Sequence, residues 1–111
     1  MPSVTEDMIR DMASVIVRQV SPEAIILFGS QGTDKAGSNS DVDLLVVEST
    51  PYGRGNDRRQ RMTLLWKALA KYPVSKDILV YSRDEVDHWR DARNHIIAKA
   101  LKEGRFLYGA L

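Results

Sequence analysis

Two short apolar runs, separated by a polar loop, limit the folds open to this chain more than any other feature. The first run, "EAIILFG", and the second, "VDLLVVES", are each nearly continuous and rich in β-branched residues. Runs of this length and composition favour buried strands. The segment between them, residues 31–40, is rich in Gly, Ser, Asn, Asp and Lys, which is typical of a loop.

The rest of the chain shows helical and strand patterns in turn. A capping-box pattern at Ser3 and Glu6 precedes apolar residues at helical spacing, and Pro22 ends that helix. A second helix is expected from about residue 57 to 72, a third strand in "SKDILVYS", and one last helix from a second capping box at Ser82 to near residue 104. The final "RFLYGAL" fits a short edge strand or a docked tail. This order predicts an α+β fold, a small mixed β-sheet covered by helices, in a single domain spanning residues 1–111.

Composition narrows the class without naming a function. The formal net charge of +1 leaves no basic surface over the whole protein, so direct DNA binding is not expected. No apolar run approaches the roughly 20 residues of a membrane span, and the charged first helix does not resemble a signal peptide. The chain has no cysteine, which excludes disulfides and thiolate metal sites and fits a cytoplasmic protein.

Asp41 and Asp43 stand at the entrance of the second strand, on either side of Val42. Residues two apart in a strand point to the same face, so the two carboxylates are expected to project together. They would repel unless a cation lay between them, and magnesium favours one or two carboxylates together with substrate phosphates. The alternative is that Asp41 caps a turn and Asp43 ends a solvated strand.

Two further features fit the same site. Gly29 and Ser30 end the first strand, where a glycine lets the backbone approach a phosphate and a hydroxyl can donate to it, although Gly-Ser is also a common turn. Asp77 opens the third strand, where an aspartate is unexpected on propensity, and its alternative role is that of a turn residue. If the third strand lies beside the second, Asp77 joins Asp41 and Asp43 at one edge of the sheet. We call these three aspartates the carboxylate rim.

With "GS" followed after ten residues by "DVD", each at a strand end, the chain resembles the DNA polymerase β nucleotidyltransferase superfamily. Its small size and its ending "AKALKEGRFLYG" are similar to the minimal nucleotidyltransferases, often encoded as the antitoxin partner of a HEPN-domain ribonuclease. The resemblance implies a polymerase β-like fold, with Gly29 and Ser30 on the triphosphate. It further implies that Asp41, Asp43 and Asp77 bind magnesium, with two ions in the two-metal pattern.

One position departs from the family pattern. Such proteins frequently carry an arginine after the Gly-Ser, and here that residue is Gln31. Charge-assisted contact with the triphosphate would then be weaker, or would come from Lys35 or from the basic segment Arg54 to Arg61. Without a functional role, that segment would be an ordinary solvent-exposed helix start. A docking patch for an acidic partner is a further alternative.

The sequence thus predicts a magnesium-dependent nucleotidyltransferase. We expect it to move AMP from ATP to a hydroxyl of a protein or RNA, as the antitoxin of a HEPN-type pair, in a homo- or hetero-oligomer. The alternative is an inactive antitoxin that neutralises a ribonuclease by binding; a DxD glycosyltransferase is disfavoured because the chain is short.

Trp66 and Trp89 are expected in the core, and His88, Asp91 and His95 on a solvated face of the last helix rather than in a metal site.

Overall fold

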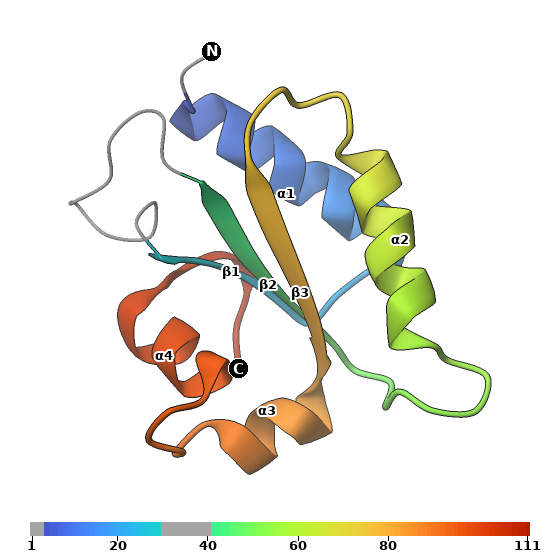
Figure 1. Ribbon diagram of the computed structural model, residues 1–111, viewed down its shortest axis with the longest axis vertical. Helices are drawn as coiled ribbons and strands as arrows, with labels where there is room; N and C mark the ends of the chain where they lie inside the picture. The colour runs from blue at the N-terminus through green and yellow to red at the C-terminus, as the bar shows by residue number, and fades with distance from the viewer. Residues whose placement is uncertain (1–3, 30–40) are drawn as a thin grey trace.

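A four-stranded mixed sheet with helices on both faces forms the framework of the molecule (Figure 1). The computed structural model describes residues 4–29 and 41–111. Its elements in chain order are α1 (Glu6–Val20), β1 (Ala24–Phe28), β2 (Val42–Glu48), α2 (Arg58–Ala68), β3 (Lys76–Ser82), α3 (Arg83–Trp89), α4 (Ile96–Glu103) and β4 (Arg105–Gly109). The α+β class and the mixed sheet predicted from the sequence are confirmed.

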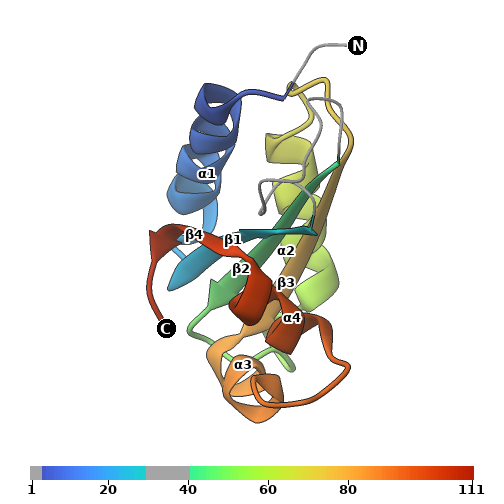
Figure 2. The same ribbon diagram turned by 90° about the vertical axis from the view of Figure 1, so that its left-hand side faces the viewer.

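The strand order is β3-β2-β1-β4. β1 pairs antiparallel with both β2 and β4, whereas β2 pairs in parallel with β3. The last strand lies beside β1 at the edge of the sheet (Figure 2), which confirms the edge-strand interpretation of the C-terminal segment. The parallel pair is possible because α2 provides the crossover connection between β2 and β3.

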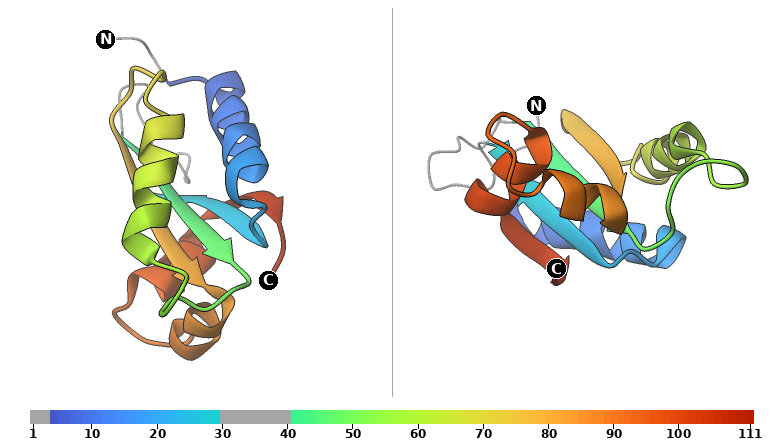
Figure 3. Two further views of the ribbon diagram at one scale, coloured as in Figure 1. Left: turned by 90° about the vertical axis from the view of Figure 1, so that its right-hand side faces the viewer. Right: turned by 90° about the horizontal axis from the view of Figure 1, so that it is seen from below.

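Each face of the sheet has its own apolar core (Figure 3). On one face α1 and α2 cover Leu44, Val46 and Ile78, and on the other α3 and α4 cover Leu45 and Val47. Both faces of β1 and β2 are therefore buried, which explains why these strands read as continuous apolar runs rather than as alternating ones. Odd-numbered residues of β2 face α3 and α4, and even-numbered ones face α1 and α2.

The helix boundaries differ from the predicted ones in two places. The N-cap of α1 is Thr5, whose side chain accepts a hydrogen bond from the Met8 backbone N–H at 3.1 Å; Ser3 lies outside the described residues. The single last helix was wrong, because the chain breaks at residues 90–95 into α3 and α4. The capping box between Ser82 and Glu85 is confirmed. In the described part of the chain, no helix combines the length and apolar character needed to cross a membrane.

Candidate active site

Asp43 on β2 and Asp77 on β3 occupy paired positions in the parallel ladder. Neighbouring strands lie about 4.8 Å apart, and side chains at paired positions leave the sheet on the same face. For this pair it is the face that carries α3 and α4, because Leu45 and Leu79, two residues further along each strand, pack into that core. The expectation that Asp77 joins Asp43 on one rim is confirmed for these two residues.

Gly29 closes the rim from the side of β1. It follows Phe28, which is paired with Asp43 across the antiparallel ladder, and its φ of +67° lies in the left-handed region that glycine adopts without strain. A Cβ at this position would collide with the carboxylate of Asp43. The backbone of Gly29 therefore approaches the acidic side chain as closely as the chain allows, and any other residue would displace it.

The surroundings of Asp43 raise the pKa of its carboxyl group. The largest cause is partial burial, followed by the negative charges of Asp77 and then Asp41, while the positive charge of Lys99 on α4 acts in the opposite direction. Asp41 and Asp77 are both exposed, so the rim is open to solvent at its outer side. Desolvation and like charges together are the conditions under which a bound cation stabilises the ionised form.

The donor set fits a hard divalent cation. Carboxylate oxygens are the ligands that magnesium prefers, and the mutual repulsion at Asp43 is the cost that such an ion would remove. No group of three or more His, Cys, Asp or Glu side chains within residues 4–29 and 41–111 is already gathered around one point as metal ligands. Joint coordination by Asp41, Asp43 and Asp77 thus stays a prediction.

The loop residues expected at the phosphates, Ser30, Gln31 and Lys35, lie outside the described residues. Gly29 is the one member of the predicted nucleotide-binding set whose surroundings the structure gives. Its position beside Asp43 is what a turn holding a triphosphate over the carboxylates would require.

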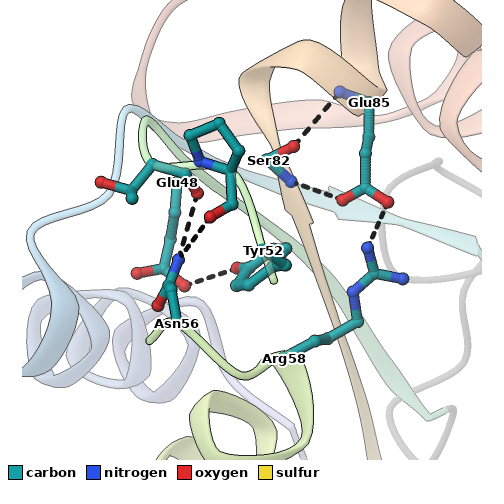
Figure 4. A network of polar contacts seen from close by, with 8 residues as sticks. Glu48, Tyr52, Asn56, Arg58, Ser82 and Glu85 are labelled. Carbon is teal, nitrogen blue, oxygen red and sulfur yellow. Dashed lines mark hydrogen bonds and ion pairs between the residues drawn. The ribbon is translucent and has the colours of Figure 1, made fainter. Parts of the chain in front are cut away.

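The basic segment is placed away from this rim, in contrast to one of the interpretations of the sequence. Arg61 pairs with Glu48 at 3.2 Å. Arg58 pairs with Glu85 (Figure 4), so both arginines contact carboxylates within the protein. Glu48 ends β2 five residues after Asp43, which separates the two by about 17 Å along the strand. Arg58 and Arg61 therefore do not supply the missing triphosphate contact; they anchor α2 to the opposite end of the sheet.

Tyr52 belongs to the same network. Its hydroxyl donates to Glu48 at 2.5 Å, and the guanidinium of Arg58 lies 5.0 Å from its ring centroid. Burial, followed by the hydrogen bond to Glu48, raises the pKa of Tyr52. These contacts assign Tyr52 a structural role, not one in stacking on a nucleotide base.

The expected positions of the two tryptophans were wrong. Trp66, on α2, is 40% exposed. Trp89 is 39% exposed, because α3 ends at this residue and does not continue the apolar stripe into the core. The indole of Trp89 stacks on His95, with ring centroids 4.4 Å apart. His95 caps α4 through Nδ1, which accepts from the Ile97 N–H at 3.1 Å, so His88 and His95 do not share one helix.

Lys99 is the functional candidate that the sequence did not reveal. It lies on the exposed side of α4, where a lysine is ordinary, and only the packing of α4 against the sheet brings its charge near Asp43. It also lines a groove of about 770 Å³ formed by the α3–α4 turn and α4. No sequence signal distinguishes it from the other helical lysines.

Similarity to known proteins extends over nearly the whole chain. The family model described as "Polymerase beta, Nucleotidyltransferase" matches residues 11–110. Among solved structures, the MntA-HepT toxin-antitoxin matches with 20% identity over 95% of this chain and 74% of that chain, at a TM-score of 0.59. A toxin-antitoxin with AMP-PNP matches with 21% identity over 91% of this chain and 73% of that chain, at a TM-score of 0.55. The search of curated proteins found no match.

Proposed function

The chain belongs to the polymerase beta nucleotidyltransferase family, and from that premise we propose that it transfers AMP from ATP to a hydroxyl group of a protein or RNA acceptor. The observation that carries the proposal is the pairing of Asp43 with Asp77 across the parallel ladder, together with the close approach of Gly29 to Asp43. Carboxylates in register and a close backbone turn are the parts that a metal-assisted phosphoryl transfer needs.

Each residue has a proposed task. Asp41, Asp43 and Asp77 would hold magnesium, and Gly29 would let the backbone of its turn approach the triphosphate without a side chain in the way. When bound, magnesium would offset the phosphate charge and lower the pKa of the attacking hydroxyl. The hydroxyl oxygen would bond to the α-phosphorus and lose its proton to solvent, while the bond between the α-phosphorus and the bridging oxygen breaks and pyrophosphate leaves.

The proposed partner is a toxin of the HEPN type. The structural relatives include toxin-antitoxin complexes, one of them with AMP-PNP, and these support both an antitoxin role and adenine nucleotide as substrate. A mutant of the MntA-HepT complex is a further match, with 19% identity and a TM-score of 0.55. We therefore propose that the chain forms a hetero-oligomer with such a toxin.

A labelling assay tests the proposal. Wild type, Asp41→Asn and the exposed control Asp7→Asn are incubated with magnesium and host-cell lysate, using ATP labelled at either the α- or the γ-phosphate. Transfer of the α label alone, lost in Asp41→Asn and kept in Asp7→Asn, is the expected result. Transfer of the γ label would contradict it. Neutralisation of the toxin without any labelling, by wild type and Asp41→Asn alike, would favour the inactive antitoxin.

A further inference from the structure

The groove beside α4 has the size of a ligand site. Its volume of about 770 Å³ lies within the roughly 300–1,000 Å³ typical of small-molecule pockets. It is formed by the turn that joins α3 to α4 and by α4 itself, and these helices cover the face of the sheet to which Asp43 and Asp77 point. The lining includes six charged side chains: Arg90, Asp91, Arg93, Lys99, Lys102 and Glu103.

The charge of this groove is positive and largely uncompensated. Four of the six charged residues are cations and two are anions. Arg90 pairs with Asp87 at 3.4 Å, whereas no carboxylate of the described residues lies within ion-pair distance of Arg93, Lys99 or Lys102. A concave surface with three such cations favours an anionic ligand.

Lys99 connects the groove with the carboxylate rim, since it lines the groove and its positive charge acts on Asp43. α4 packs on β1, and Gly104 at its end lies so close to the Leu27 backbone carbonyl that a Cβ there would collide with it. β1 ends at Phe28, one residue after Leu27, and Gly29 follows it beside Asp43. The charge of Lys99 accordingly lowers the pKa of the Asp43 carboxyl, against the larger effects of burial and the neighbouring aspartates.

We propose that the groove is a phosphate-binding site, with Lys99 at the end next to the carboxylates and Arg93 in the turn at the other end. This inference rests on the proposed nucleotidyl transfer, because it assigns the groove to one of the two substrates of that reaction. The phosphate groups come either from the polyphosphate of the nucleotide or from the backbone of a nucleic-acid acceptor. In both cases Lys99 supplies the positive charge that an arginine after the Gly-Ser frequently supplies in the family.

Phosphate fits these residues better than a lone carboxylate does. The guanidinium of Arg93 can bind phosphate oxygens in a bidentate manner, while the two lysines act as point charges. Lys99 and Lys102 are three residues apart, on neighbouring positions of one helix face, so they can contact successive phosphates. A row of cations matches a chain of anionic groups.

Binding measurements test the proposal without requiring any transfer. Wild type, Lys99→Ala, Arg93→Ala and the control Lys67→Ala are titrated with two probes: α,β-methylene ATP with magnesium, and a single-stranded RNA of about ten nucleotides. Lys67 is an exposed lysine of α2, so Lys67→Ala removes the same charge at a site outside the groove. We expect Lys99→Ala to lower the affinity for at least one probe roughly tenfold, as for loss of a charged hydrogen bond. Lys67→Ala should leave the affinity for both probes unchanged.

The two probes identify the source of the phosphate. A lower affinity for the nucleotide probe alone assigns the groove to the polyphosphate. A lower affinity for the RNA probe alone assigns it to the acceptor, and a lower affinity for both probes assigns it to both substrates. Unchanged binding of both probes in Lys99→Ala and Arg93→Ala overturns the proposal. So does equal weakening by Lys67→Ala, or a wild type that binds neither probe. If Lys99→Ala loses probe binding but wild type transfers no label, the groove is a phosphate-binding site and the proposed transfer is rejected.

Discussion

Asp43 of β2 and Asp77 of β3 face the same side of the sheet because they are partners in a parallel ladder. Their proximity follows from the strand order and not from their separation of 34 residues along the chain. A parallel register fixes both Cα positions, so the two carboxylates are held in place by the buried strands behind them.

Replacing Asp77 by Asn should remove transfer and leave the fold intact. The amide keeps the size of the side chain but loses its charge, and Asp77 is exposed, so the free energy of unfolding should change by no more than about 0.5 kcal/mol. Transfer should fall roughly 100-fold or more, as for loss of a group that stabilises the transition state. Label transfer and thermal unfolding, measured on the same preparation, check both parts. Nearly full transfer in Asp77→Asn would contradict the assignment.

Gly29→Ala should impair the site beyond its effect on the backbone. The left-handed φ of +67° costs alanine about 1–2 kcal/mol, and the added Cβ would also collide with the Asp43 carboxylate. Gly55→Ala is the matched control, since Gly55 has a φ of +84° but no atom within 4 Å of an added Cβ. Both variants should lose stability in denaturant titrations, whereas only Gly29→Ala should lose transfer. Equal transfer by the two variants would remove Gly29 from the site.

Arg61→Ala should destabilise the protein without weakening nucleotide binding. Glu48 is 5% exposed and would lose its cationic partner, keeping the hydroxyl of Tyr52. We expect a loss of about 1–2 kcal/mol, less than for a fully buried pair because Arg61 itself stays about one-third exposed. Arg59→Ala, at an exposed position of the same helix, should be nearly neutral. Loss of nucleotide affinity in Arg61→Ala, with unfolding unchanged, would instead return the basic segment to the active site.

The contact between Tyr72 and Asp11 should make stability sensitive to alkaline pH. Burial, followed by the hydrogen bond that its hydroxyl donates to Asp11, raises the pKa of Tyr72 from 10.0 to about 12. Above pH 10 the unfolded chain loses this proton while the folded protein keeps it, so the free energy of unfolding falls as pH rises. The advantage of wild type over Tyr72→Phe should therefore shrink between about pH 10 and pH 12. If the difference in free energy of unfolding between wild type and Tyr72→Phe stays constant across this range, the pKa of Tyr72 is not raised by folding.

The strands and one half of the site could be predicted from the sequence. β1 and β2 read as buried runs because both of their faces are covered, and Asp41 and Asp43 were recognisable by their spacing at a strand end. The contribution of Asp77 depended on which strand lies beside β2, and apolar periodicity does not encode strand order. Lys99 could not be found at all, since its neighbourhood with Asp43 arises only from the packing of α4 on the sheet.

The break between α3 and α4 shows why helix continuity was mispredicted. The segment "RDARNH" contains neither proline nor glycine, so no residue in it forces the helix to end. The turn is stabilised instead by contacts made after folding: the side chain of His95 caps α4, and the ring of Trp89 stacks on it. The same break moves Trp89 out of the core and creates the groove lined by Lys99.

Titration with manganese, a paramagnetic substitute for magnesium, would show whether the paired aspartates bind the metal. Electron paramagnetic resonance would count the ions bound to wild type, Asp43→Asn, Asp77→Asn and the control Asp7→Asn, each with α,β-methylene ATP. We expect nucleotide-dependent manganese binding by wild type and Asp7→Asn, and its loss in Asp43→Asn and Asp77→Asn. Manganese bound as tightly by Asp43→Asn and Asp77→Asn as by wild type would contradict the claim that these paired aspartates hold the metal.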